Sequence, residues 1–196
     1  MALFIAVAVI LLVVFIIAIN AVVSNSSLES PSEAAGRYGE ETASNIIQRI
    51  LREDDLLFRN VLVSYDGKEA ELDNVIVNKN GVFIIEVKNY SGRLEGTEDD
   101  FEWVKYHTSY GGNTYIKTVK NPIKQVKRQI YILAHYLSYY GVDVWVDGYA
   151  FLLESNSPVL SEYVLPDAGA IDHALHCCRR KRISPQTISA VEKLLV

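Results

Sequence analysis

Hydrophobic positions along the chain follow a helical spacing first and an alternating spacing afterwards. Residues 38–51 repeat apolar side chains every three or four positions and predict an amphipathic helix. The period then falls to two, which predicts strands at residues 58–64, 70–78, 82–89 and 101–107, with turn residues between them. We expect these four strands to form a meander.

The second half of the chain returns to helical spacing. Pro122 opens a long helix that continues to about Tyr140 and ends before Gly141. Strands are expected within residues 142–154 and at residues 163–165, and Ser184 caps a last helix. The buried stripe of the long helix is expected to comprise Ile123, Val126, Ile130, Leu133, Ala134 and Leu137. This order of elements predicts an α/β fold with a mixed sheet.

The first residues of the chain have a different character. Residues 1–19 form an uninterrupted apolar run, and residues 21–23 extend it after Asn20. About 20 apolar residues can span a bilayer. No basic residue precedes the run and no small-residue cleavage site follows it, which favours an uncleaved anchor over a signal peptide. We therefore expect residues 1–23 to be a transmembrane helix in the lipid bilayer, residues 24–33 a linker, and the folded domain to begin at residue 34.

Composition narrows the classes of function. The 196 residues include 19 Lys and Arg against 24 Asp and Glu, so the formal net charge is -5. Such a protein cannot bind nucleic acid through bulk charge, and any such contact needs a local basic patch or a bound metal ion. Only two cysteines are present, which excludes a disulfide framework and fits a reducing cytoplasm.

Ionisable residues interrupt two neighbouring apolar strands. Asp73 lies in the first strand, and Glu86 and Lys88 lie in the second, where burial without a role would be costly. Glu86 and Lys88 share a face because side chains alternate along a strand. A hairpin loop of two residues puts Asp73 opposite Lys88, and a loop of four puts it opposite Glu86. Either loop brings all three side chains onto one face.

Two carboxylates and one ammonium group on a face suit phosphodiester hydrolysis. Asp73 and Glu86 offer the hard oxygen ligands that Mg²⁺ or Mn²⁺ prefers, and Lys88 can steady a phosphate or an attacking water. A metal held there lowers the pKa of water and offsets charge in the transition state. An ion-pair ladder on a half-exposed sheet explains the same short spacing equally well.

Two helical residues can reach this face. Glu40 precedes Ala43 by three positions and Ile47 by seven, so it is expected on the apolar stripe of the first helix, pointing toward the sheet. A simpler alternative is an acid that favours the helix dipole. Gln125 lies in the first turns of the long helix, where its amide can face Lys88 or bound water.

Basic residues concentrate around the start of the same helix. They are Lys117, Lys120, Lys124, Lys127 and Arg128. A patch of this kind beside a helix N-terminus can receive a phosphate backbone, although most such runs are solvated helix faces.

These blocks occur together in one order. They are Gly36-x-x-Gly39-Glu40, Glu71-x-Asp73-Asn74, residues 81–89, Gly92, Trp103 and Asn121-Pro122-x-x-Gln125. Over residues 34–155 they resemble the NERD (nuclease-related) domain, a branch of the PD-(D/E)XK, restriction-endonuclease-like superfamily. One small departure is Asn74, where many relatives carry His.

The resemblance implies a restriction-endonuclease-like mixed β-sheet flanked by helices. Outside it, we expect residues 156–196 to form a helical extension packed on the domain. The resemblance also implies Asp73 and Glu86 as ligands of Mg²⁺ or Mn²⁺, and Lys88, Glu40 and Gln125 as catalytic residues. Many nucleases of the superfamily act as dimers, so a homodimer is compatible with the resemblance.

A second cluster lies near the C-terminus. His173, His176 and Cys177 have the helical spacing of a zinc or redox site, with Cys178 beside them. A fourth ligand at suitable spacing is missing, and we expect no metal there.

Together these observations predict a membrane-anchored, Mg²⁺-dependent nuclease-like domain that faces the cytoplasm and hydrolyses nucleic acid, with DNA favoured over RNA. One alternative is a catalytically silent, membrane-tethered module that binds nucleic acid or serves as a scaffold. Another is an extracytoplasmic domain, released from a signal peptide, whose carboxylates are merely structural.

Overall fold

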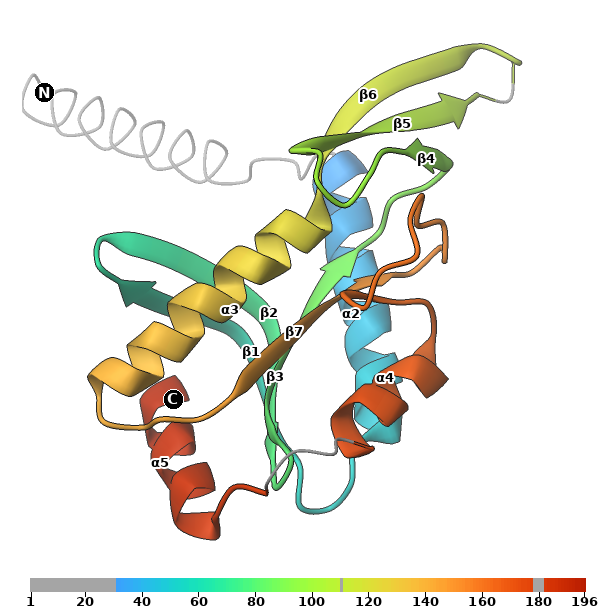
Figure 1. Cartoon of the computed structure of the whole chain (residues 1–196). Coiled ribbons are helices and arrows are strands. Elements are labelled where there is room, and N and C mark those ends of the chain that lie inside the picture. The colour runs from blue at the N-terminus through green and yellow to red at the C-terminus, as the bar shows by residue number, and fades with distance from the viewer. Residues whose placement is uncertain (1–30, 110, 178–181) are drawn as a thin grey trace, which may run out of the picture. The chain divides into compact units, whose positions relative to one another are not determined.

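The computed structural model describes residues 31–109, 111–177 and 182–196, and the site lies in a compact unit, Gly36–Val196. Its elements are α2 (Pro31–Ile50), β1 (Leu56–Tyr65), β2 (Lys68–Asn78), β3 (Gly81–Lys88), β4 (Arg93–Glu95), β5 (Glu102–Thr108), β6 (Thr114–Lys120), α3 (Pro122–Tyr139), β7 (Val146–Leu152), β8 (Val164–Leu165), α4 (Ala168–His176) and α5 (Pro185–Leu195) (Figure 1). This is the mixed α/β class that the sequence predicts.

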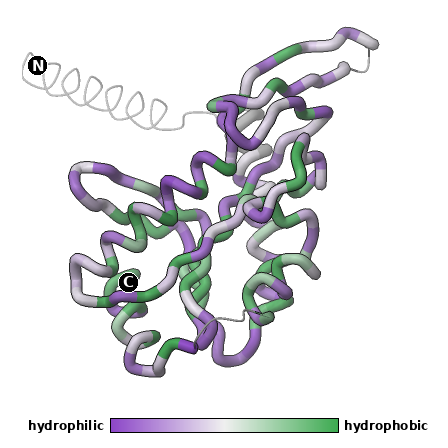
Figure 2. The backbone as a smooth tube through the Cα atoms, in the orientation of Figure 1, coloured by the Kyte–Doolittle hydropathy of each residue, from purple (hydrophilic) through white to green (hydrophobic). Residues whose placement is uncertain are grey.

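A five-stranded mixed sheet forms the centre of the unit, in the order β1-β2-β3-β7-β8. The first three strands run antiparallel, and β7 and β8 run parallel to β3. One face packs against α3 and α5 around Ile84, Leu133 and Val191. The other face packs against α2 and α4 around Ile47 and Ile85. Both faces are therefore covered, and hydrophobic segments meet between the helical layers (Figure 2).

The long helix α3 begins as the sequence predicts. The side chain of Asn121 accepts a hydrogen bond from the backbone N–H of Ile123, and Pro122 occupies the first turn. The buried face differs slightly from the predicted stripe. Gln129 and Ile132 are fully buried, whereas Ile130 and Ala134 are only partly buried. The helix is thus rotated so that an amide side chain faces the sheet.

The predicted four-stranded meander is wrong in its last strand. The segment predicted at residues 101–107 is β5, which lies in a separate three-stranded sheet with β4 and β6. The free edge of β3 is instead taken by β7, after the crossover through α3. Neither β4 nor β6 was predicted, because β4 has three residues and nearly every side chain of β6 is exposed, which removes the alternation.

The N-terminal predictions fall largely outside the described residues. These are the membrane anchor at residues 1–23 and most of the linker at residues 24–33, whose last residues belong to α2. Among the described helices, none has the length and apolar character that crossing a membrane requires.

Candidate active site

The β2–β3 hairpin sets the register of the ionisable residues. The turn is Lys79-Asn80, and Asn78 pairs with Gly81. Counting back from the Asn74–Ile85 pair puts Asp73 opposite Glu86. The sequence analysis derived the same Asp73–Glu86 pairing from a loop of four residues. In the structure the strands pair further, up to Asn78 and Gly81, so that the turn itself has two residues. The prediction that Asp73, Glu86 and Lys88 share one face is confirmed.

Glu86 is a buried carboxylate held by three donors. Only 1% of its surface is exposed. Its Oε1 accepts hydrogen bonds from Lys88 Nζ at 2.6 Å and from Gln125 Nε2 at 2.5 Å. Its Oε2 accepts from Gln129 Nε2 at 2.5 Å. Charge-assisted hydrogen bonds of this kind offset the desolvation of a buried carboxylate.

Asp73 is less well supported. Its Oδ2 accepts one hydrogen bond, from the backbone N–H of Val87 at 2.7 Å. Burial and the neighbouring charge of Glu86 raise the pKa of Asp73 from 3.8 to about 7, against the smaller opposing effects of the Val87 bond and Lys88. Asp73 therefore takes up a proton near neutral pH unless a cation compensates its charge.

Lys88 stays protonated in this environment. Burial lowers the pKa of Lys88, but the charge of Glu86 and the hydrogen bond to it outweigh burial, so that the pKa lies above its ordinary value. A protonated ammonium group can stabilise a phosphate but cannot act as a general base. Burial also raises the pKa of Tyr90, two residues further on, although the charge of Lys88 opposes this.

The first-helix acid lies at the margin of the site. Glu40 is exposed rather than directed into the core, and α2 packs on the sheet face opposite α3. Its charge nevertheless contributes to the raised pKa of Asp73. Gly39 brings this part of α2 against the end of β3, since a Cβ at Gly39 would lie 2.6 Å from the Cβ of Asn89.

Gln129 is a site residue that the sequence reasoning missed. It is 1% exposed, and its Nε2 bonds both Glu86 and the carbonyl oxygen of Glu71. A signal was present, because Gln129 lies four residues after Gln125 and falls on the apolar face of α3 between Val126 and Leu133. Its Oε1 is buried without a partner among the described residues.

The structure divides the predicted basic patch. Lys120, Lys124 and Arg128 line a hollow of about 640 Å³ together with Gln125, which connects this hollow to Glu86. Lys127 instead forms an ion pair with Glu98 at 2.7 Å. Lys117 lines a different hollow on the β5–β6 hairpin. Only part of the patch therefore lies beside the carboxylates.

A divalent cation suits the donor set. Among the described residues, no three His, Cys, Asp or Glu side chains come together as metal ligands would. Two carboxylates are nevertheless enough for Mg²⁺, which usually keeps several waters and takes one or two protein carboxylates plus substrate phosphates. The raised pKa of Asp73 shows that this carboxylate lacks a compensating positive charge. The buried Oε1 of Gln129 lacks a hydrogen-bond donor among the described residues. Asp73 and Glu86 would hold the cation.

The second cluster has a structural explanation. His176 bridges two acids, with Nε2 2.8 Å from Asp55 and Nδ1 2.5 Å from Asp172. The side chains of His176 and Asp55 are almost fully buried, whereas His173 is exposed. His176 thus fastens α4 to the loop after α2.

Fold and site together define a mixed α/β domain with a buried glutamate, an adjacent aspartate and a lysine at the centre of its sheet. Residues 35–153 match the family described as NERD, nuclease-related domain. The match covers more than half of the chain, and the chain belongs to this family.

One relative extends this comparison. An uncharacterized protein of Bacillus anthracis is 27% identical over 71 residues, which make up 36% of this chain and 34% of the relative. The matched segment thus spans about a third of the relative's length. No solved structure matches the chain.

Proposed function

We propose that this domain is a metal-dependent nuclease that hydrolyses phosphodiester bonds of nucleic acid, with DNA favoured over RNA. The observation that carries the proposal is the buried Glu86, which three donors hold beside Asp73. A surface ion-pair ladder needs no such burial. The membership of the chain in a nuclease-related family supports the same reaction class.

The charges of the site favour a phosphodiester once a cation is bound. With both carboxylates ionised and Lys88 protonated, the three side chains carry one net negative charge. A divalent cation reverses this to one positive charge, which attracts a phosphate. The cation would supply Lewis-acid chemistry and lower the pKa of water.

The protein side chains have separate tasks in this proposal. Glu86 and Asp73 hold the cation, and Lys88 stabilises negative charge that develops on the phosphate. Gln125 and Gln129 orient Glu86 through their hydrogen bonds. Glu40 stands at the margin, where its charge acts on Asp73. Lys120, Lys124 and Arg128 bind the phosphate backbone beside the site.

The test is cleavage of supercoiled, linear and single-stranded DNA, and of RNA, by the full chain in detergent with Mg²⁺ or Mn²⁺. Glu86→Gln and Lys88→Ala should each lower cleavage by at least about 100-fold. Lys193→Ala, which removes an exposed lysine of α5, should cleave like the parent. Cleavage retained by Lys88→Ala would refute the mechanism. Binding of nucleic acid without cleavage by the parent would favour the silent, tethered module.

A further inference from the structure

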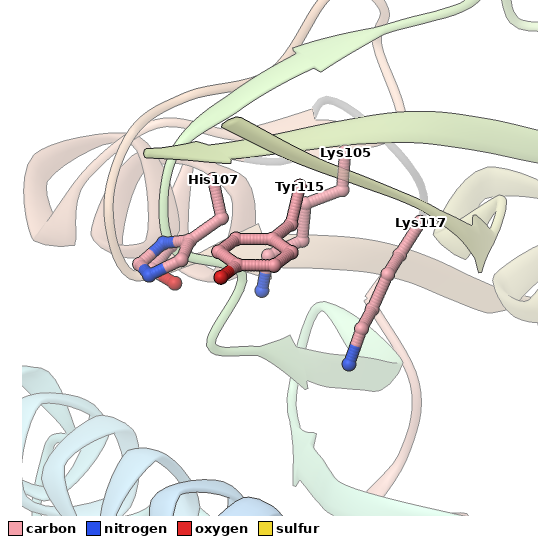
Figure 3. Close-up of a pocket in the computed structure, with 5 residues that line it drawn as sticks. Lys105, His107, Tyr115 and Lys117 are labelled. Atoms are coloured by element: carbon pink, nitrogen blue, oxygen red, sulfur yellow. The ribbon is translucent and has the colours of Figure 1, made fainter. Parts of the chain in front are cut away.

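One face of the β5–β6 hairpin, the inner face, carries side chains that lie outside the candidate active site. Side chains alternate along both strands, and the register pairs Trp103 with Val119, Lys105 with Lys117 and His107 with Tyr115. The first pair is buried or partly buried against the third hydrophobic cluster. The other two pairs continue the same face past this core. They line a hollow of about 350 Å³ together with Ser91 (Figure 3).

The two lysines form a like-charge pair. They lie directly opposite each other across the strands, an arrangement that destabilises a hairpin. Neither ammonium group makes an ion pair or hydrogen bond with any residue that the structure describes. An anion between the two groups would relieve the repulsion. Lysine pairs of this type suit the phosphate of a nucleic acid backbone.

Two rings accompany the lysines. Tyr115 is 54% exposed, and His107 lies opposite it on the neighbouring strand. Both side chains extend from the hairpin to the same side as the lysines (Figure 3). An exposed aromatic ring next to phosphate-binding lysines is the arrangement with which proteins stack unpaired bases. Bases inside a duplex are stacked on each other and present no free ring face.

The hairpin is fastened to the strand that carries the catalytic residues. Tyr90 Oη donates a hydrogen bond to the carbonyl oxygen of Lys120 at 3.2 Å, which joins the end of β6 to the extension of β3. Gly92 touches β5 so closely that a Cβ would lie 2.2 Å from the carbonyl oxygen of Tyr106. Ser91 is three residues after Lys88, so their Cα atoms are at most about 11 Å apart. The hollow therefore lies within a few nucleotides of the carboxylates.

We propose that the inner face of the β5–β6 hairpin binds unpaired nucleotides, with Lys105 and Lys117 on a phosphate and Tyr115 stacked on a base. This proposal rests on the proposed nuclease function and adds a subsite and a preference for single-stranded segments. The hairpin holds the strand on one side of the site. The hollow lined by Lys120, Lys124 and Arg128 receives the backbone on α3.

The experiment measures binding of fluorescent oligonucleotides to the full chain in detergent, by anisotropy in EDTA. The probes are a single strand of about 12 nucleotides and the duplex of the same sequence. Tyr115→Ala should weaken binding of the single strand at least about fivefold and leave duplex binding within about twofold. Tyr115→Phe keeps the ring and should bind like the parent.

The lysines are tested through salt dependence. Lys105→Gln combined with Lys117→Gln should reduce the slope of log affinity against log salt by about 0.7 for the single strand, because the two lysines hold one phosphate. Lys68→Gln combined with Lys193→Gln removes the same charge from exposed positions outside the hairpin and should change the slope less. Equal effects of the two double variants would overturn the phosphate assignment. Equal binding of the single strand by Tyr115→Ala and the parent would overturn the stacking.

The same measurements separate this proposal from the proposed function. Glu86→Gln should lose cleavage and keep the preference for single strands. A parent that cleaves nucleic acid, while the hairpin variants bind as the parent does, refutes the hairpin site and leaves the nuclease. A folded parent that neither cleaves nor binds nucleic acid refutes both.

Discussion

Without metal, the protein should lose stability as the pH rises from about 4 to about 8, and Asp73→Asn should remove this loss. The pKa of Asp73 is about 7 in the folded protein, against an ordinary value of 3.8. Between these values the folded state holds a proton that the unfolded chain has released. The stability is therefore fully present below pH 3.8 and is lost as the pH rises through about 7.

The magnitude follows from the two pKa values. Each pKa unit corresponds to about 1.4 kcal/mol, so the difference between 3.8 and about 7 amounts to about 4 kcal/mol of unfolding free energy by pH 8. An asparagine at position 73 can still accept the hydrogen bond from Val87 and carries no charge beside Glu86. At pH 8 the variant should unfold roughly 8 °C or more above the parent. At pH 5 the parent has lost only about 1 to 2 kcal/mol and the melting difference should be less than half as large, and below about pH 4 the two should nearly coincide.

The assay is thermal unfolding of the full chain in detergent with EDTA, followed by circular dichroism at several pH values. Glu71→Gln, which neutralises an exposed carboxylate of the same strand, should keep the pH dependence of the parent. Adding Mg²⁺ at pH 8 should stabilise the parent and not Asp73→Asn, since a cation compensates the negative charge of Asp73 beside Glu86, and the variant lacks that charge. A melting difference between parent and Asp73→Asn that is the same at pH 5 and pH 8 would refute the reasoning.

Two further predictions concern packing, one beside the site and one at the His176 bridge. Gly36→Ala should stabilise α2 by about 0.5 to 1 kcal/mol, because the new Cβ meets nothing within 4 Å, whereas Gly39→Ala should destabilise by at least about 1 kcal/mol through its clash with Asn89. Urea unfolding measures the change in unfolding free energy of both variants. Equal changes in Gly36→Ala and Gly39→Ala would contradict the close approach of Gly39 to Asn89. His176→Leu should lower the unfolding free energy by about 2 kcal/mol because the buried Asp55 loses its imidazole partner and keeps the hydrogen bond from the backbone N–H of Arg52, while the exposed His173→Leu should change it by less than about 0.5 kcal/mol. A small loss in His176→Leu would show that the bridge is not needed.

Local pattern identified most elements of the central sheet. β1, β2, β3 and β7 have alternating or continuously apolar sequences, and α3 has a proline and an asparagine cap at its start. Of the three-stranded sheet, the sequence predicted β5 and neither of its neighbours. Its other strands are held by pairing with β5, through the Arg93–Tyr106 and Lys105–Lys117 registers, and their own side chains are too exposed to show a period.

The site was predictable where it depends on one hairpin. Any even loop places Asp73, Glu86 and Lys88 on one face, so the grouping did not require the exact register. The contribution of α3 could be predicted only by knowing how the helix is rotated against the sheet. The observed rotation buries Gln129 and Ile132, which the predicted stripe did not include. Pattern alone could place Gln125 near the site but not assign it to an oxygen of Glu86.

The support given to the two carboxylates is unequal, and this inequality bears on how the site works. Three side-chain donors hold the charge of Glu86, and one backbone N–H supports Asp73. A fold selected only for stability would fill both positions with apolar residues or add a donor for Asp73. Under the proposed function, the cation would supply the support that Asp73 lacks, and cation binding and folding would be coupled in the same pair of residues. Stability that rises with Mg²⁺ at neutral pH is therefore expected of the same structure that would cleave nucleic acid.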